Sequence, residues 1–270
     1  MSNHAIIDDF SPWPHRWALL LCGTTFPLLW VGGLITTTDA GMAVPDWPNT
    51  YGYNMFAYPW QTWMFGPWDL FIEHGHRLLA SLVGLLAIGL LVVVWRSDRR
   101  RWMRSLALAA LALVIFQGVL GGLRVVANER LLAMAHGSTG PLFFALTCVI
   151  VVLTLRRPYG AGRPAAAAAS DDGGLSRLAL LTAALAYCQL VLGASLRHVD
   201  AATGPWAFGV LVKFHLFLAA VVAVQTLWVM VRTVRSRSPQ RAVRVIGVLL
   251  GLVVTAQVGL GVATWAAKYG

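Results

Sequence analysis

The sequence predicts an all-α integral membrane protein made of two similar bundles of transmembrane helices. Of the 270 residues, 58% are hydrophobic and only 12% are charged, and the mean hydropathy is +0.68. The chain also holds seven apolar runs, each near the ~20 residues that a helix needs to cross a bilayer. An ordinary soluble domain is therefore excluded. We expect spans at 16–37, 70–95, 103–124, 131–155, 175–196, 206–232 and 242–266.

The net charge of +10 is concentrated between alternate spans, which argues against a nucleic-acid partner. Arginines follow the second, fourth and sixth spans, so these connections belong on one side of the membrane. By the positive-inside rule that side is cytoplasmic. We therefore expect a cytoplasmic N-terminus and outer loops at 38–69, 125–130 and 197–205. The arginines are Arg96, Arg99, Arg100, Arg101, Arg104, Arg156, Arg157, Arg163, Arg232, Arg235, Arg237, Arg241 and Arg244.

An internal repeat divides the chain into two halves. Gly-Pro-Trp occurs at 66–68 and at 204–206, and a histidine follows the proline by nine residues at His76 and by ten at His215. At ~1.5 Å per residue, both imidazoles lie roughly 13 to 15 Å into their helices. We expect an N-terminal bundle of four helices at 1–156, a cytoplasmic linker at 157–174 and a C-terminal bundle of three helices at 175–270.

A second repeat is Gln-x-x-Leu-Gly, in which the two end residues share one helix face. The glycine would let a neighbouring helix or a flat macrocycle approach the backbone, and the glutamine would offer a hydrogen bond across the bundle. Tight helix packing alone is the alternative interpretation. The motif occurs at 117–121, 189–193 and 257–261, so Gln117 is a candidate cofactor contact.

Histidines inside apolar helices suggest axial ligands of haem iron. His76 and His136 both enter from the outer surface, so they could clamp one haem from its two faces. His215 would then bind a second haem, but its expected partner, 139 residues after His136, would fall near 275, beyond Gly270. We therefore expect that this chain lacks an eighth helix, through a truncated sequence, an incomplete gene or a seven-helix variant. Hydrogen bonding between helices is the alternative role of these histidines.

Glu73 lies three residues before His76, where a carboxylate could relay protons, orient an imidazole or act on bound substrate. The alternative is a solvated charge at the membrane interface. His74 faces another side of the helix and is expected to be interfacial or to support the site. Arg77 could pair with a haem propionate or with Glu73. Weaker propionate candidates are Arg197, His198 and Lys213.

The loop at 36–68 is long and rich in aromatic residues, which favours either an aromatic belt at the bilayer interface or a lid over a haem edge. Cys22, Cys148 and Cys188 all fall within apolar helices, so we expect them to pack there rather than to form a disulfide.

Together these motifs resemble the haem A synthase family, the membrane enzymes that convert haem O to haem A for cytochrome oxidase. The resemblance covers most of the chain. It consists of Glu73-x-x-His76-Arg77, the loop sequence at 41–48, Gln117-Gly-Val-Leu-Gly-Gly122, Ala135-His136-Gly137 and His215.

The resemblance implies a pseudo-twofold pair of four-helix bundles in a bacterial inner membrane, with haem O as substrate in the first and haem b as cofactor in the second. By this analogy His76 and His136 flank haem O, Glu73 is the catalytic acid, and a ring methyl is oxidised to an aldehyde. Molecular oxygen and an external electron donor would be consumed, and haem O synthase and oxidase assembly proteins are expected partners. Val44 and Thr50 stand where some bacterial members carry cysteines.

Two other functions remain open on the residues alone. The same histidines would serve a cytochrome b that transfers electrons, and the missing helix would suit an assembly factor that handles haem without chemistry. Glu73 discriminates between an enzyme and an electron carrier, because electron transfer alone does not need its carboxylate.

Overall fold

The computed structural model describes residues 11–155, 173–199, 202–236 and 241–269, and these ranges are helical with connecting loops. Seven helices within them are long and apolar enough to cross a membrane, which confirms the expected spans to within a few residues at each end. The predicted linker at 157–174 lies almost entirely outside the described residues, as do Arg156, Arg157, Arg163 and Arg237. The helices are α1 (Trp13–Thr37), η1 (Met55–Ala57), α2 (Trp60–Met64), α3 (Trp68–Ser97), α4 (Arg101–Ala127), α5 (Arg130–Leu153), α7 (Gly173–Arg197), α8 (Pro205–Arg235) and α9 (Arg241–Tyr269).

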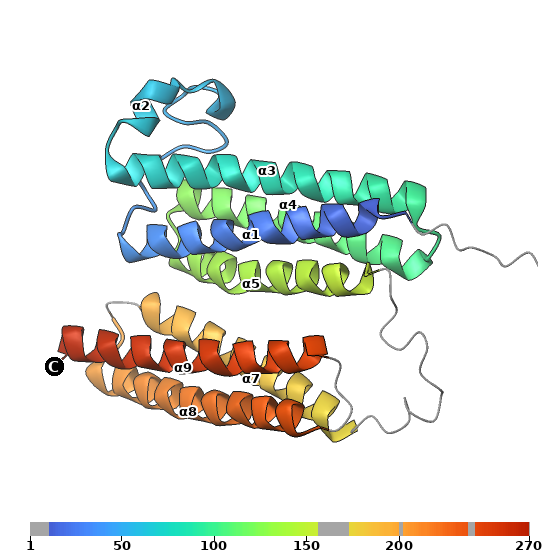
Figure 1. Ribbon diagram of the computed structural model, residues 1–270. Coiled ribbons are helices and arrows are strands. Elements are labelled where there is room, and N and C mark those ends of the chain that lie inside the picture. The colour runs from blue at the N-terminus through green and yellow to red at the C-terminus, as the bar shows by residue number, and fades with distance from the viewer. Residues whose placement is uncertain (1–10, 156–172, 200–201, 237–240, 270) are drawn as a thin grey trace, which may run out of the picture. The chain divides into compact units, whose positions relative to one another are not determined.

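The helices form two compact units, divided between Ala161 and Gly162. In the first unit, α1 and α4 each pack against both α3 and α5, so the four long helices form a bundle (Figure 1). The helices α3 and α5 are therefore diagonal partners across this bundle. His76 and His136 lie on these two helices.

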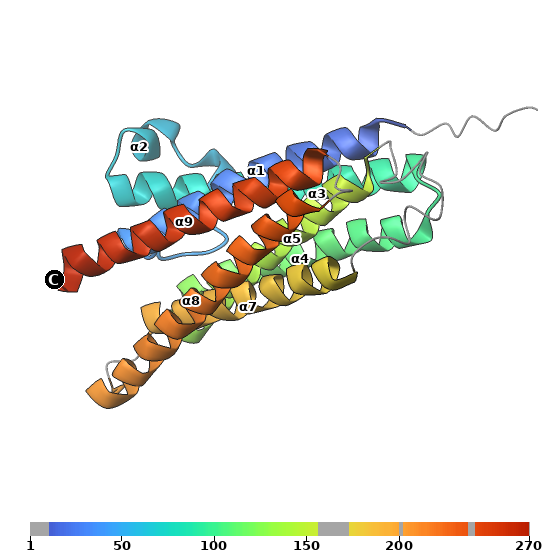
Figure 2. The same cartoon turned by 60° about the horizontal axis from the view of Figure 1, so that its bottom comes forward.

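In the second unit α8 lies between its two neighbours and packs against both α7 and α9 (Figure 2). Its buried side chains, Thr226, Val229 and Thr233, are all in its C-terminal half. The hydroxyl of Thr233 donates to the carbonyl of Val229, four residues back, at 2.8 Å. Such bonding to its own helix lets a polar side chain be buried without a partner elsewhere.

Proline and asparagine set the helix ends near the histidines. Pro205 is the first residue of α8, as the sequence predicts, whereas Pro67 lies just before α3 in an extended conformation. Both positions suit proline because neither needs its missing N–H. Asn128 ends α4 in a left-handed conformation with φ 50°, which asparagine tolerates better than most residues. Since α5 begins at Arg130, the ends of α4 and α5 are held close together.

The hydrophobic core of the first unit fills the half of the bundle away from the histidines. Small residues contribute from three helices, and they allow the backbones to approach closely. Large side chains such as Leu21, Leu90 and Ile150 fill the remaining space and are fully buried. The small residues are Ala18 on α1, Ala87 on α3, and Ala107 and Ala110 on α4.

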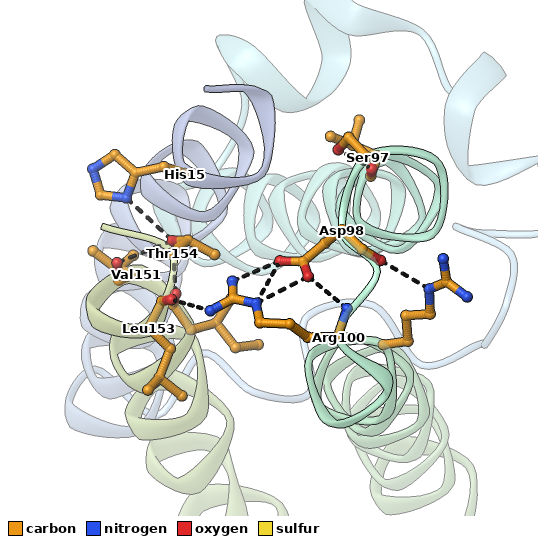
Figure 3. Close-up of polar contacts among 10 residues, drawn as sticks. His15, Ser97, Asp98, Arg100, Val151, Leu153 and Thr154 are labelled. Atoms are coloured by element: carbon orange, nitrogen blue, oxygen red, sulfur yellow. Dashed lines mark hydrogen bonds and ion pairs between the residues drawn. The ribbon is translucent and has the colours of Figure 1, made fainter. Parts of the chain in front are cut away.

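A polar cluster closes the end of the bundle opposite the histidines (Figure 3). Asp98, in the α3–α4 connection, pairs with Arg100 at 2.6 Å, and Arg100 also donates to the carbonyl of Leu153 at the end of α5. His15 on α1 lies 3.1 Å from the hydroxyl of Thr154. Burial alone would raise the pKa of Asp98, but the hydrogen bonds and charge of Arg100 outweigh it and lower this pKa below its ordinary value of 3.8. The cluster therefore ties three parts of the bundle together at this end.

Candidate functional site

Two histidines in the first unit are each seated on a glycine of a neighbouring helix. His76 on α3 lies against Gly32 of α1, and a Cβ added to Gly32 would come within 3.1 Å of its Cε1. His136 on α5 lies in the same way against Gly121 of α4, at 3.0 Å. Each imidazole thus occupies space that a side chain at the glycine would fill. The two rings also lie close enough to interact electrostatically.

The nitrogens of these rings are held differently. Nδ1 of His76 is buried and makes no hydrogen bond within the described structure, although the backbone of Leu28 is near the ring. Nδ1 of His136 lies 3.1 Å from the carbonyl oxygen of Gln117. With the Gln117 amide turned so that both of its atoms find partners, its nitrogen also lies 3.1 Å from the same Nδ1. An Nδ1–H that donates to the Gln117 carbonyl orients His136 and leaves the lone pair of Nε2 for a ligand, whereas the amide of Gln117 can donate to Nδ1 only in the other tautomer.

This geometry suits haem better than a bare metal ion. In the described parts of the chain, no group of three or more His, Cys, Asp or Glu side chains is arranged to bind an ion. Haem iron needs only one or two axial side chains, because the macrocycle supplies the other ligands. A buried ring nitrogen without a partner, as in His76, is costly unless a ligand satisfies it. His76 and His136, on diagonal helices, are residues of the type that binds haem iron.

The second unit contains a third histidine that packs against a glycine of a neighbouring helix. A Cβ on Gly193 of α7 would lie 3.1 Å from Cε1 of His215 on α8. The amide nitrogen of Gln189 lies 3.1 Å from Nδ1 and 3.2 Å from Nε2 of the same ring. The expected hydrogen bond of the glutamine across the bundle is thus present in both units. The group that approaches each glycine is an imidazole from the next helix.

The contacts between glycine and histidine depart from the Gln-x-x-Leu-Gly pattern in two ways. The third copy of the motif, on α9, has no atom within 4 Å of a Cβ added to Gly261. Conversely, Gly32 seats His76 without a glutamine, since Leu28 stands four residues before it. In the sequence Gly32 is only one of two adjacent glycines in an apolar helix, so its contact with His76 could not be predicted.

Glu73 is buried, with 2% of its surface exposed. Its Oε2 accepts a hydrogen bond from the backbone N–H of Val44 at 3.0 Å, and its Oε1 accepts one from Arg77 at 2.9 Å. The interpretation of Glu73 as a solvated interfacial charge is therefore wrong. The carboxylate is covered because the segment at 41–51, which we call the strap, folds across α3.

Arg77 holds the strap through its terminal nitrogens. It donates to the backbone carbonyls of Val44 at 2.8 Å, Asp46 at 2.7 Å and Asn49 at 3.1 Å, in addition to Glu73. The expected pairing of Arg77 with Glu73 is thus observed. Four bonds occupy both terminal nitrogens, so a propionate would have to reach Arg77 through Nε or displace the strap.

Within the strap, Asp46 fixes a tight turn. Its carboxylate accepts hydrogen bonds from the backbone N–H groups of Tyr51 at 2.8 Å and Gly52 at 2.7 Å. Burial works to raise the pKa of Asp46, but these two bonds and the charge of Arg77 outweigh it and lower the pKa below its ordinary value. Asp46 therefore stays ionised and keeps the turn closed at neutral pH.

His74 anchors the end of the strap and the loop that follows it. It is 1% exposed, and its Nδ1 lies 3.2 Å from the hydroxyl of Thr50. The rings of Tyr58 and Trp63 pack against it with centroids 5.4 and 5.1 Å away. His74 and His76 thus face different neighbours, as two positions two residues apart on a helix must. His74 acts in the folding of the loop.

Arg124 is a site residue that sequence reasoning missed. Its guanidinium donates to the carbonyl of Gly41 at 3.0 Å and interacts electrostatically with Glu73, His76 and His136. Gly122, two residues earlier, is in contact with the ring of Trp47. The end of α4 therefore holds the strap and seats His136 within four residues. An arginine just after a Gln-x-x-Leu-Gly-Gly sequence was the available signal.

The other predicted propionate candidates belong to the second unit. Lys213 and Arg197 are exposed on α8 and at the end of α7, and Nδ1 of His198 lies 2.9 Å from the carbonyl of Ala194 on its own chain segment. Cys22 and Cys148 have sulfurs 3.5 Å apart, and they and Cys188 are unoxidised.

A membrane four-helix bundle with a diagonal pair of seated histidines defines a haem-handling class of membrane protein. Comparison with known families agrees. The family model COX15-CtaA, described as cytochrome oxidase assembly protein, matches residues 15–269. Because the match covers nearly the whole sequence, the chain belongs to the COX15-CtaA family.

Individual relatives are similar to this chain over different fractions of its length. A protein named haem A synthase from Shouchella clausii is 29% identical over 86% of this chain and 80% of its own length. One of the same name from Halalkalibacterium halodurans is 28% identical over 64% of this chain, but the match spans little more than half of that relative, 56%. A Halobacterium salinarum protein named protohaem IX farnesyltransferase is 30% identical over 50% of this chain and 29% of its own length. No solved structure matches the chain.

Proposed function

We propose that this chain is a haem A synthase, which oxidises a ring methyl of haem O to a formyl group through hydroxylated intermediates. Molecular oxygen and an external electron donor would be consumed. The family and the names of its relatives support this activity. The observation that carries it is the buried carboxylate of Glu73, one turn before a histidine whose Nδ1 is buried and unbonded.

In this proposal His76 and His136 bind the iron of the substrate haem from its two faces. Their glycine seats fix both rings, so the haem position is set by side chains that move little. The backbone carbonyl of Gln117 would accept a hydrogen bond from Nδ1–H of His136 and thereby direct the opposite nitrogen toward the haem.

Glu73 is the proposed catalytic group, and the strap controls its freedom. Both carboxylate oxygens are engaged in the present structure, one by Val44 and one by Arg77. Each oxygen accepts one hydrogen bond and keeps a further lone pair, so Glu73 can exchange a proton at the ring methyl while both bonds hold it in place. If the strap moved, loss of the Val44 N–H would make Oε2 more basic while Arg77 on the same helix stayed paired. The strap would thereby influence proton transfer at Oε2.

Arg124 is the proposed partner of a substrate propionate. Arg77 is hydrogen-bonded to Glu73 and also acts on the ionised Asp46, whereas Arg124 interacts with Glu73 only at longer range. The only hydrogen bond of Arg124 within the described residues is to Gly41, so most of its donors are unused. A carboxylate would use these donors and balance the charge.

The second unit would hold a haem b cofactor with His215 as one axial ligand. Gln257 and Gly261 on α9 repeat the motif that packs against a histidine in its other two copies, so this face of α9 is the proposed seat of the opposite ligand. Arg197, His198 and Lys213 remain candidates for its propionates.

We place the protein in a bacterial inner membrane with its arginine-rich connections in the cytoplasm and the histidines toward the outer face. A haem that already carries its prenyl group is the proposed substrate, which the relative named protohaem IX farnesyltransferase supports. Haem O synthase and oxidase assembly proteins are the proposed partners.

The decisive experiment is expression of the protein with haem O synthase, followed by haem extraction and mass measurement. We expect haem O and haem A from the unaltered chain. With Glu73→Gln we expect bound haem O and no haem A, whereas Asp69→Asn, an exposed carboxylate one turn earlier on α3, should leave haem A formation intact. Undiminished haem A from Glu73→Gln would overturn the catalytic role of Glu73. Haem b as the sole extracted haem would contradict the substrate assignment.

A further inference from the structure

The segment at 52–68, which we call the aromatic lobe, lies outside the helix bundle. It contains η1 and α2, and both views show α2 beside the N-terminal part of α3, away from the other helices of the first unit (Figures 1 and 2). The lobe is fastened to α3 by its inner face. Trp63 stacks on Phe71 of α3, with ring centroids 6.0 Å apart, and with Tyr58 it packs against His74.

The outer face of the lobe is apolar and exposed. Phe56 is 70% exposed and Phe65 is 76% exposed, and Tyr53 and Trp60 are also exposed. From 47 to 68 the sequence has no charged residue. Large uncharged apolar surfaces of this kind mark contact with a membrane or another protein.

The position of the lobe favours the membrane. The 30 residues of α3 give a helix about 45 Å long, which exceeds the ~30 Å hydrocarbon core, so both of its ends reach the headgroup region. Trp68, in the first turn of α3, is exposed and stacks on Phe71, so the apolar face of the lobe continues the lipid-facing surface of that helix. Tryptophan and tyrosine rings favour this headgroup level.

We propose that the aromatic lobe lies in the lipid headgroup region of the leaflet at the histidine end and docks onto phospholipid through Phe56, Trp60 and Phe65. The backbone supports this placement, because a Cβ on Gly66 would collide with the carbonyl of Thr62, so this tight turn between lobe and α3 requires glycine. Insertion fixes the membrane depth of α3. His76, eight residues into the helix, then lies about 12 Å below the lobe, within the bilayer.

Depth-resolved fluorescence quenching tests this proposal in the full chain. In a background with Cys22, Cys148 and Cys188 replaced by serine, Phe56→Cys and Phe65→Cys would each be labelled with an environment-sensitive fluorophore in nanodiscs. The quenchers would be lipids carrying a nitroxide at acyl carbon 5 or 12, and aqueous iodide. Leu85→Cys, exposed midway along α3, serves as the deep control, and Glu129→Cys, in the α4–α5 turn, as the aqueous control.

We expect the labels at positions 56 and 65 to be quenched at least twofold more by the carbon-5 than by the carbon-12 nitroxide. Iodide should quench them several-fold less than the label at position 129. Iodide quenching equal to that at position 129 would overturn the proposal, because the lobe would then lie in water. Protection from iodide and from both lipids would also overturn it, since a protein would then cover this face.

Discussion

The carboxylate of Glu73 on α3 accepts a hydrogen bond from the backbone N–H of Val44, 29 residues earlier in the chain, at 3.0 Å. This bond joins the residue proposed to act on the substrate to the strap that covers it. Arg77, one turn later, binds Glu73 and three strap carbonyls. Folding of the strap and burial of the carboxylate are therefore a single event.

Glu73→Gln should destabilise the strap as well as abolish haem A formation. The amide keeps an acceptor for Val44 but loses the charge that pairs with Arg77. We expect a loss of roughly 1–3 kcal/mol of unfolding free energy, the usual size for a hydrogen bond to a charged group. Thermal unfolding followed by tryptophan fluorescence would measure it, with Asp69→Asn as control. An unchanged midpoint would show that the Glu73–Arg77 pair contributes nothing to stability.

Gly121→Val should displace His136 and weaken haem retention in the first unit about tenfold, which corresponds to ~1.4 kcal/mol. The matched control is Gly118→Val on the same helix, where an added Cβ has no atom within 4 Å. Gly193→Val should affect the haem of the second unit alone. Retention is measured by titrating released haem against apomyoglobin. Equal losses from Gly118→Val and Gly121→Val would contradict a seat specific to His136.

Arg124→Gln should weaken binding of haems that carry free propionates about tenfold, because a buried charged pair is lost. Binding of the haem dimethyl ester, which has no carboxylates, should change little. Arg124→Lys should recover part of the difference. The affinities come from absorption titrations of the solubilised full chain. If the ester and the free acid were affected equally, Arg124 would act by holding the strap at Gly41 and not by binding a propionate.

The Asp98–Arg100 pair should make stability depend on pH at acidic values. Because the pKa of Asp98 is lowered in the folded protein, its contribution is present above the unfolded value near 3.8 and is lost as the pH falls through the folded value. Asp98→Asn should therefore lower the unfolding midpoint at pH 7, and the difference from the unaltered protein should shrink below about pH 4. Calorimetry of both proteins measures this, and a difference that stays constant with pH would contradict it.

Much of the architecture is predictable because it is local. Each span can be recognised from about twenty apolar residues. In the hydrocarbon core such a segment forms a helix, because the helix satisfies its backbone hydrogen bonds internally. The distance of His76 and His215 from the starts of their helices also follows from the Gly-Pro-Trp positions and the rise per residue of a helix. Assigning His74 and His76 to different faces needs only the helical period.

The contacts that build the site are not local, and the sequence did not contain them in readable form. Gly32 seats His76 across 44 positions, and Arg124 reaches Gly41 across 83. Neither partner is marked by a spacing rule. The burial of Glu73 likewise depends on how a long loop folds back, which apolar periodicity cannot report.

The sequence by itself determined the seven spans and the positions of His76 and His215 along their helices, because the length and period of a helix in a membrane are set by the bilayer and the backbone. Only the tertiary structure decided that the glutamine and glycine of the repeated motif hold an imidazole, that His74 anchors a loop, and that Glu73 is sealed beneath the strap. These roles arise from side chains distant in sequence that meet at a few ångströms, where hydrogen bonding and steric fit act.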